Sequence, residues 1–326
     1  MRLSKSTVSL VIACTTLTSL TACGRGASES DGGTSAILVM STLDNPFFVS
    51  VADGAKDGAK ELGIDLSVEN ANNSDESALN LTIDAVTQKP DVMIIDPVSG
   101  QGGTAMVEQA NQASVPIMAF DRQPESGDLA NFIGYDAIAA GRKGADALAE
   151  AIGEQGKVVE IQGIMGTNVA QERSQGFEEE IKKFPGIEIV ATQAAEFDRG
   201  TALDVMTNVL QANPDIDGVY AANDEMALGV VAALKSRGLN GKVQVVGNDG
   251  IADALKAVAA GDMYATHAES PYSLGKEVIK IAADIAAGED PGANKVLEGT
   301  LVKKADVSNF CAQLDKIGDT ETCQGL

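Results

Sequence analysis

The sequence has 326 residues, more than one hydrophobic core usually serves, so we expect two lobes. Its 47 acidic residues outnumber its 24 basic ones, and the formal net charge of −23 argues against a nucleic-acid partner. The acidic residues form no long blocks, so we expect them to be spread over a solvated exterior.

The N-terminus has the pattern of an export signal. Arg2 and Lys5 make a short basic region, and the mostly apolar run from Val8 to Leu20 follows. Leu20-Thr21-Ala22-Cys23 resembles the bacterial lipoprotein signal, which implies removal of residues 1–22 and lipid attachment to the Cys23 sulfur. An ordinary secretory signal with a chance cysteine remains the alternative. No later stretch reaches the ~18 uninterrupted apolar residues of a membrane span.

Residues 23–35 are rich in Gly and Ser and are typical of a flexible tether between a membrane anchor and a soluble domain. Beyond Cys23, the exported chain has two cysteines, Cys311 and Cys323. In an exported protein such a pair is expected to form a disulfide, so we interpret residues 311–326 as a tail held by that bond.

The first strand-to-helix connection places aromatic and polar residues together. Ala36–Met40 suits a buried strand, Pro46 suits the first position of a helix, and Asn45 can cap that helix. Phe48 begins an apolar helical stripe, but Phe47 lies about 100° away from it, so packing on the sheet does not explain Phe47. We therefore expect an exposed aromatic residue near a ligand. The alternative is that both rings belong to the core and Asn45 is only a cap.

Short apolar runs then alternate with helical patterns along the chain. This alternation predicts an α/β fold of two similar doubly wound parallel-sheet lobes. We expect short hinge strands to join the lobes and the chain to cross between them more than once. Further strands are expected at Ile64–Val68, Val92–Ile95, Pro116–Phe120, Phe132–Gly134, Val158–Gln162, Ile187–Thr192, Gly218–Ala221, Val243–Gly247, Tyr264–Ala268 and Val296–Val302. Helices are expected at Ser74–Gln88, Gly102–Gln112, Ala137–Ile152, Ala170–Lys183, Arg199–Gln211, Glu225–Ser236, Ile251–Ala260 and Tyr272–Ala287.

Polar side chains follow many of these strands. The carboxyl ends of parallel strands share one edge of a sheet, so such residues converge there. One or two of them would be ordinary helix caps, but this number favours a cleft for a polar small molecule. The residues are Asn45 and Phe47, Asp96, Asp121 and Arg122, Asn223 and Asp224, and Asn248 and Asp249.

From about Ser35 to Lys304 the sequence resembles the ribose-binding proteins of bacterial ABC importers. The resemblance lies in a set of short motifs that keep the same order and nearly the same spacing. They are Ser41–Ser50, Asp121-Arg122-Gln123, Gln162–Thr167, Glu172–Phe177, Phe197-Asp198-Arg199, Ala222–Gly229 and Val245–Gly250.

The resemblance implies two lobes joined by three hinge strands that close on one monosaccharide or polyol. The expected N-terminal lobe is 36–135 plus 270–297, and the expected C-terminal lobe is 136–269 plus 298–310. The protein would be an exported monomer, lipid-anchored at the outer face of the membrane or periplasmic. It would deliver its ligand to a membrane permease driven by a separate ATPase.

The motifs also carry over the family's ligand contacts to this chain. The sugar ring would lie between Phe47 and Phe48 from one lobe and Phe197 from the other, because the C–H face of a sugar meets the negative face of an aromatic ring. Carboxylates, amides and arginines would bind its hydroxyl groups. These residues would be Asn45, Asp121, Arg122, Arg173, Asn223 and Asp249.

Three positions depart from the ribose pattern. Asp96, Asn248 and Glu269 stand where the ribose-binding proteins have asparagine, phenylalanine and glutamine. These changes remove one stacking face and bring the formal charge of the site to −2, which argues against an anionic ligand. We expect all three to contact a neutral sugar or polyol with a hydroxyl pattern unlike that of ribose. An amino sugar stays open.

Several of these residues also have purely structural interpretations. Arg173 could pair with Glu172 or Asp198, and Asp224 and Glu225 are expected to cap the helix that follows them. The only histidine, His267, has no nucleophile or metal ligand beside it in the pattern and is interpreted as a packing or surface residue.

The sequence lacks the motifs of cofactor and metal enzymes. It has no dinucleotide fingerprint, Walker loop, metal-ligand cluster or Ser/His/Asp set, so we expect no cofactor and no catalysis. A sugar-processing enzyme using Asp121 and Asp249, and a binding protein that presents sugar to a receptor, remain as alternatives. A repressor of the same fold would need a DNA-binding module where this chain has its export signal.

Overall fold

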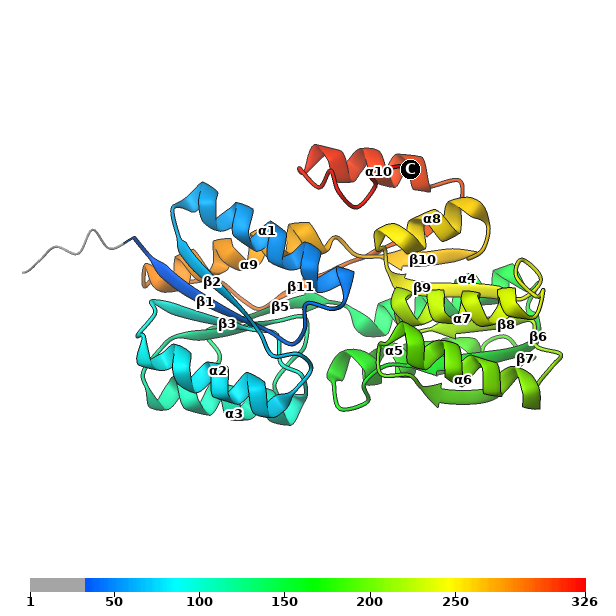
Figure 1. Ribbon diagram of the computed structural model, residues 1–326, viewed down its shortest axis with the longest axis horizontal. Helices are drawn as coiled ribbons and strands as arrows, with labels where there is room; N and C mark the ends of the chain where they lie inside the picture. The colour runs from blue at the N-terminus through cyan, green and yellow to red at the C-terminus, as the bar shows by residue number, and fades with distance from the viewer. Residues whose placement is uncertain (1–32) are drawn as a thin grey trace, which may run out of the picture. The chain divides into compact units, whose positions relative to one another are not determined.

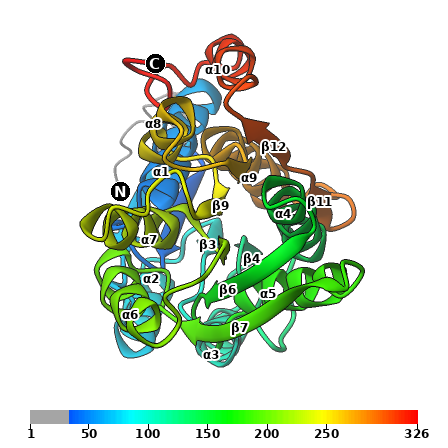
Figure 2. The same ribbon diagram turned by 90° about the vertical axis from the view of Figure 1, so that its right-hand side faces the viewer.

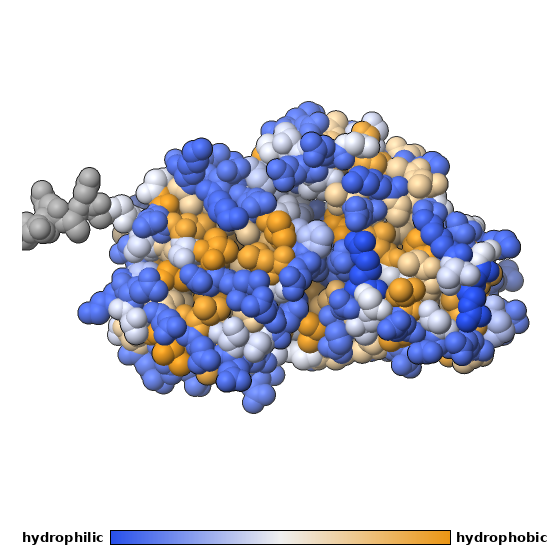
Figure 3. All heavy atoms as spheres, viewed as in Figure 1, coloured by the Kyte–Doolittle hydropathy of each residue, from blue (hydrophilic) through white to orange (hydrophobic). Residues whose placement is uncertain are grey.

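The computed structural model describes residues 33–326 (Figure 1). The expected signal segment 1–22, the lipid site at Cys23 and most of the tether lie outside the described residues. Within the described part of the chain, no helix is long and apolar enough to cross a membrane. Hydrophilic side chains are spread over the face drawn in Figure 3, and apolar residues lie between them.

The first sheet has six strands in the order β11-β5-β4-β3-β1-β2, and every neighbouring pair is parallel. Helices α1 (Pro46–Leu62) and α9 (Pro271–Ala286) pack together on one face, while α2 (Asp75–Thr87) and α3 (Gly100–Gln112) cover the other (Figure 1). Its strands are β1 (Ser35–Met40), β2 (Asp65–Asn70), β3 (Val92–Ile95), β4 (Ile117–Phe120), β5 (Asn131–Tyr135) and β11 (Lys295–Leu297).

The second sheet has the order β12-β10-β9-β8-β6-β7 and is parallel except for β12. Helices α4 and α5 lie on one side of it, and α6, α7 and α8 lie on the other (Figure 2). Its strands are β6 (Gln155–Gln162), β7 (Gly186–Ala194), β8 (Gly218–Ala221), β9 (Gln244–Asp249), β10 (Ala265–Ala268) and β12 (Thr300–Lys303). Its helices are α4 (Ala137–Ala151), α5 (Asn168–Ile181), α6 (Arg199–Ala212), α7 (Asp224–Ser236) and α8 (Ala252–Ala260).

The chain crosses between the two sheets three times: after β5, after β10 and between β11 and β12. The predicted fold class, two doubly wound α/β lobes with a three-strand hinge, is confirmed. The single strand expected at Val296–Val302 is wrong, because β11 pairs with β5 in one sheet and β12 pairs with β10 in the other. Glu298 and Gly299 connect them and form the third hinge crossing.

A helix that the sequence analysis did not predict, α10 (Val307–Lys316), runs from the end of the expected second lobe into the expected tail, 311–326. Val307, Phe310 and Leu314 are buried on one face of it. A disulfide joins Cys311, within this helix, to Cys323 beyond it. Helix α10 contacts α8 and β12 of the second lobe, while residues 318–322 beyond it border a cavity together with residues of α1 and α9 in the first lobe.

Helix α1 places the first strand-end residues. The Asn45 side chain accepts a hydrogen bond from the Phe47 N–H at 2.9 Å, and Pro46 occupies the first helical position. Close packing of α1 on α9 depends on two glycines: a Cβ on Gly54 would lie 2.0 Å from the Tyr272 carbonyl oxygen, and one on Gly275 equally close to that of Val51. This packing fixes α1 on its sheet and so directs its first turn toward the other lobe.

Candidate ligand-binding site

The carboxyl edges of the two sheets meet at a small cavity of about 20 Å³. Nine of the twelve predicted ligand residues border it, and Val169 borders it as well. Val169 was missed by the sequence analysis, although it precedes Arg173 by four residues and so shares its face of α5. The lining residues are Asn45, Phe47, Phe48, Asp121, Arg122, Val169, Arg173, Phe197, Asn223 and Asp249.

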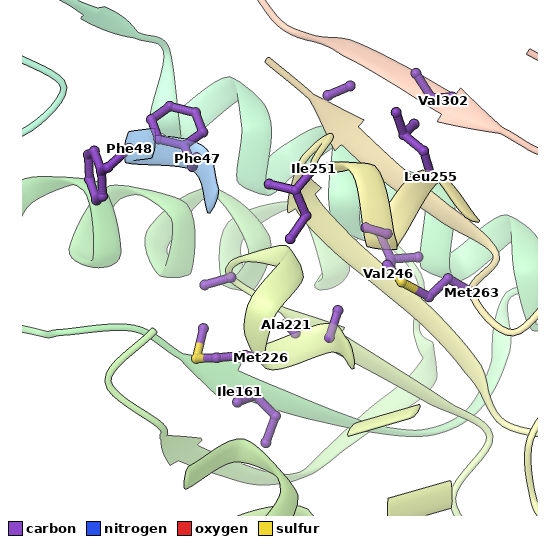
Figure 4. Packing of buried hydrophobic residues seen from close by; sticks show 14 of the residues in the cluster. Phe47, Phe48, Ile161, Ala221, Met226, Val246, Ile251, Leu255, Met263 and Val302 are labelled. Carbon is purple, nitrogen blue, oxygen red and sulfur yellow. The ribbon is translucent and has the colours of Figure 1, made fainter. Parts of the chain in front are cut away.

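Three phenylalanine rings, together with Val169, form the apolar part of this lining. Phe47 and Phe48 meet edge to face, with centroids 5.3 Å apart (Figure 4), and Phe197 lies in the other lobe. The Arg122 guanidinium carbon is 5.1 Å from the Phe48 centroid and 5.7 Å from that of Phe197. One cation thus contacts an aromatic ring from each lobe, a favourable arrangement because the ring faces are negative.

The expectation that Phe47 would be exposed is wrong. Phe47 and Phe48 are each 3% exposed, because residues of both lobes surround them at the cavity. The two interpretations of this segment are therefore not exclusive, since both rings are buried and both border the cavity.

The Phe197 ring depends on an unusual backbone and on one glycine. Glu196 and Phe197 have φ values of +55° and +59°, in the left-handed region that favours glycine. A Cβ on Gly163, at the end of β6, would lie 2.1 Å from the Phe197 ring. The structure accepts backbone strain here, and this strain aims an aromatic ring at the cavity.

Arg173 is the centre of a buried charge network. Its Nη1 donates to the Ala222 carbonyl at 2.9 Å and to Asp249 Oδ1 at 3.3 Å, and its Nη2 donates to Glu269 Oε1 at 2.9 Å. The structural alternative of a pair with Glu172 or Asp198 is wrong, because Arg173 points inward from α5. Burial opposes the charge of Arg173, but the carboxylates of Glu269 and Asp249 raise its pKa above the ordinary value.

Asp249 lies in a turn that Asp224 holds. Asp249 has a φ of +128°, and the buried Asp224 carboxylate accepts hydrogen bonds from the N–H groups of Gly250 (2.7 Å) and Ile251 (3.1 Å). The other carboxylate oxygen of Asp224 accepts a hydrogen bond from Thr266 Oγ1 at 2.8 Å. The expectation that Asp224 caps α7 is wrong, since Asp224 faces inward and the Asn223 side chain accepts from the Met226 N–H instead.

The three positions that depart from the ribose pattern lie behind the cavity and do not border it. Asp96 accepts hydrogen bonds from the N–H and hydroxyl of Ser41, with Arg122 Nε 3.9 Å from its other oxygen. Asn248 donates to Glu269 Oε1 at 3.0 Å and to Asp249 Oδ1 at 3.3 Å. Each therefore contacts a side chain that borders the cavity.

Burial sets the protonation of the acidic residues here. It raises the pKa of Asp96 to about 7, although Arg122 opposes the rise. Burial also raises the pKa of Asp121 and of Glu269, and that of Asp249 well above its ordinary range, against the attraction of nearby arginines. Among the described residues there is no cluster of His, Cys, Asp or Glu suited to a metal ion.

The two lobes also touch beside the cavity. The Gly100 N–H donates to the Gly166 carbonyl at 3.1 Å, and the Gln123 N–H donates to Asn168 Oδ1 at 2.8 Å. The first bond comes from the start of α3 and the second from the β4–β5 connection, and both end between β6 and the first turn of α5 in the other lobe. A cavity of about 20 Å³ has room for about one water molecule. A larger molecule therefore enters only when the lobes separate.

Residues 36–290 match the family model described as a periplasmic binding protein domain. The chain belongs to this family. The matched residues include all the residues that border the cavity.

Relatives in this periplasmic binding protein family resemble nearly the whole described chain. The ribose import binding protein RbsB of Salmonella typhimurium is 39% identical over 267 residues, which are 82% of this chain and 90% of that protein. The D-allose-binding periplasmic protein of Escherichia coli is 37% identical over 257 residues, covering 76% and 83%. A solute binding protein of Actinobacillus succinogenes, solved with bound D-allose, superposes with a TM-score of 0.81 at 33% identity, covering 85% and 99%.

Proposed function

We propose that this protein is the substrate-binding component of an ABC sugar importer and binds one neutral monosaccharide or polyol. The observation that supports this most is the composition of the cavity, in which three aromatic rings and two arginines stand among amides and carboxyls. Aromatic faces stack on the apolar side of a sugar ring, and charged groups make strong hydrogen bonds to hydroxyls. The relatives named for ribose and D-allose import agree with this chemistry.

The proposed mechanism is hinge closure. With the three crossings as hinges, the lobes would separate to admit the sugar and then close on it. We assign residues 36–135 plus 270–297 to one lobe and 136–269 plus 298–310 to the other, with 311–326 as the disulfide-bonded tail. The closed form would then dock, as a monomer, on a membrane permease with a separate ATPase.

A thermal-shift and calorimetric screen tests the binding role. The panel is D-ribose, D-allose, D-arabinose, xylitol, myo-inositol and glucosamine, because it varies ring size, hydroxyl pattern and charge. We expect at least one neutral member to raise the melting temperature, since ligand bound only by the folded form stabilises it. The role is refuted if no member of the panel, and no other pentose, hexose or alditol, binds. Recovery of a chemically changed sugar, seen by NMR, would show an enzyme.

Asp121→Ala tests the assigned site. Asp121 borders the cavity with a φ of +56°, and its removal takes a hydroxyl partner from any bound sugar. We expect at least about a tenfold loss of affinity, the equivalent of about 1.4 kcal/mol. The matched control is Asp128→Ala, an exposed acid of the same lobe that does not border the cavity. Equal affinity in both variants would remove Asp121 from the site.

We also propose that the chain is exported and lipid-anchored through Cys23 after removal of residues 1–22. The support is the sequence pattern at the N-terminus, together with the periplasmic family. In cells expressing the full chain, we expect labelled palmitate to be incorporated and the protein to fractionate with membranes. Cys23→Ala should abolish the label and release the protein. A labelled Cys23→Ala variant would contradict the assignment.

A further inference from the structure

His267 lies on β10 directly opposite Asn248 of β9, its partner in the parallel ladder. The only histidine of the chain is buried, with Nδ1 3.0 Å from Asn248 Oδ1. The Asn248 amide in turn donates to Glu269 and Asp249, the two acids that hold Arg173. A continuous hydrogen-bonded chain therefore runs from the imidazole to an arginine at the cavity.

The hydrogen bonds fix the direction of each member. The Asn248 NH₂ group faces two carboxyl groups, so its carbonyl oxygen faces His267. That oxygen only accepts hydrogen bonds, so the proton must lie on Nδ1 of the imidazole. His267 Nε2 has no hydrogen-bond partner among the described residues.

The far side of the imidazole contacts the hinge. A Cβ on Gly299 would lie 2.4 Å from His267 Cε1, so only a glycine lets the crossing between β11 and β12 pass over the ring. The Gly299 carbonyl accepts a hydrogen bond from Lys143 Nζ of α4 at 3.2 Å. His267 is therefore packed between the hinge and the residues behind the cavity.

We infer that His267 is a positioning residue for ligand binding, acting through Asn248 to hold Glu269, Asp249 and Arg173 in place. The effect on affinity rests on the proposed sugar-binding function, whereas the hydrogen-bonded chain itself does not. Loss of the imidazole N–H leaves the Asn248 oxygen buried without a donor and frees the amide to turn. The two carboxyl groups would then lose their shared donor, and Arg173 would lose its fixed direction. Burial also lowers the pKa of His267 to about 3, which keeps the imidazole neutral.

NMR of the ligand-free protein tests the chain of bonds directly, because one histidine gives one pair of imidazole nitrogen signals. With a tag that contains no histidine, we expect a protonated Nδ1 and an unprotonated Nε2 in the wild type. In Asn248→Ala this preference should relax toward a mixture. A wild-type imidazole protonated on Nε2, or an unchanged Nδ1–H form in Asn248→Ala, would overturn the inference.

Two substitutions separate positioning from packing. His267→Leu fills space without a donor, while His267→Asn can present an N–H near the place of Nδ1. For D-ribose and D-allose measured by calorimetry well below unfolding, we expect about a tenfold loss in His267→Leu, from one buried unsatisfied acceptor. His267→Asn should stay within about threefold of the wild type.

Val302→Ala, a buried β12 residue outside this network, controls for lost stability. Its affinity should match the wild type even where its melting temperature falls as far as that of His267→Leu. Wild-type affinity in His267→Leu, equal loss in both histidine variants, or equal loss in Val302→Ala would each overturn the inference. If the wild type bound neither these sugars nor any other in the panel, the proposed function would fail, and the NMR result alone would decide.

Discussion

Replacing Arg173 with methionine should destabilise the protein in a pH-dependent way. Methionine keeps much of the aliphatic bulk but removes the guanidinium that faces Asp249 and Glu269 at 3.3 and 2.9 Å. All three side chains are buried. Removing one member of a buried ion network costs about 3–5 kcal/mol when the partners stay ionised. We therefore expect a loss of about 4 kcal/mol near pH 7.5.

The expected loss is smaller in acid. Burial already raises the pKa values of Asp249 and Glu269 in the wild type, and without Arg173 they rise further. A carboxyl with a raised folded-state pKa binds a proton more readily when folded, so its contribution to stability falls as pH rises toward that pKa. Lowering the pH toward 5 favours the protonated form of both groups in the variant, so less uncompensated charge is buried there. The remaining loss is that of neutral hydrogen bonds, about 2 kcal/mol.

Urea unfolding followed by circular dichroism measures both losses, since the chain has no tryptophan. Arg199→Met is the matched control, because Arg199 also bonds a carboxylate, Glu225, but is 42% exposed and should cost at most about 1 kcal/mol. The double variant with Glu269→Gln should recover part of the loss near pH 7.5. Equal losses at the two pH values, or no recovery in the double variant, would refute the reasoning.

Three further predictions concern Glu160, Asp224 and the disulfide. Burial raises the pKa of Glu160 from 4.5 to about 7. Ionisation of Glu160 should therefore lower the free energy of unfolding by about 3 kcal/mol as the pH rises through that range, and in Glu160→Gln urea unfolding should show a flatter dependence of stability on pH. Asp224→Asn should release the 249–251 turn and weaken sugar binding about tenfold in calorimetry, whereas the exposed Asp253→Asn should not. Replacing both Cys311 and Cys323 with serine should cost up to about 3 kcal/mol, seen as faster hydrogen exchange confined to α10 and the tail.

The alternation of strands and helices was predictable because each element has a regular apolar period and clear ends. The errors lie in segments whose local sequence pattern does not determine the secondary structure. In Val296–Val302, two apolar pairs of residues flank Glu298, Gly299 and Thr300, and we interpreted the segment as one strand. It is two strands because its first part pairs with β5 in one sheet and its last part pairs with β10 in the other. Helix α10 has an apolar face, but we interpreted its segment through the cysteines alone.

The site was predictable to the extent that strand ends converge. Residues such as Asp121 and Arg173 border the cavity because of their position on a sheet edge or a helix face. The direction of Asn248 depends on the pairing of β9 with β10, which brings His267 opposite it. The pairing of these two strands cannot be inferred from the sequence pattern. For this reason the sequence analysis did not identify Asn248 as the partner of His267.

The buried acids change the expected electrostatics of the site. The formal sum of −2 assumes that Asp96, Asp121, Asp249 and Glu269 are all ionised. Since the pKa of Asp96 rises to about 7, and burial raises those of the other three, a part of that negative charge is absent near neutral pH. Asp96 and Glu269 do not border the cavity, whose lining has Asp121 and Asp249 against Arg122 and Arg173, so the formal charges of the lining cancel. This balance agrees with the proposed neutral ligand.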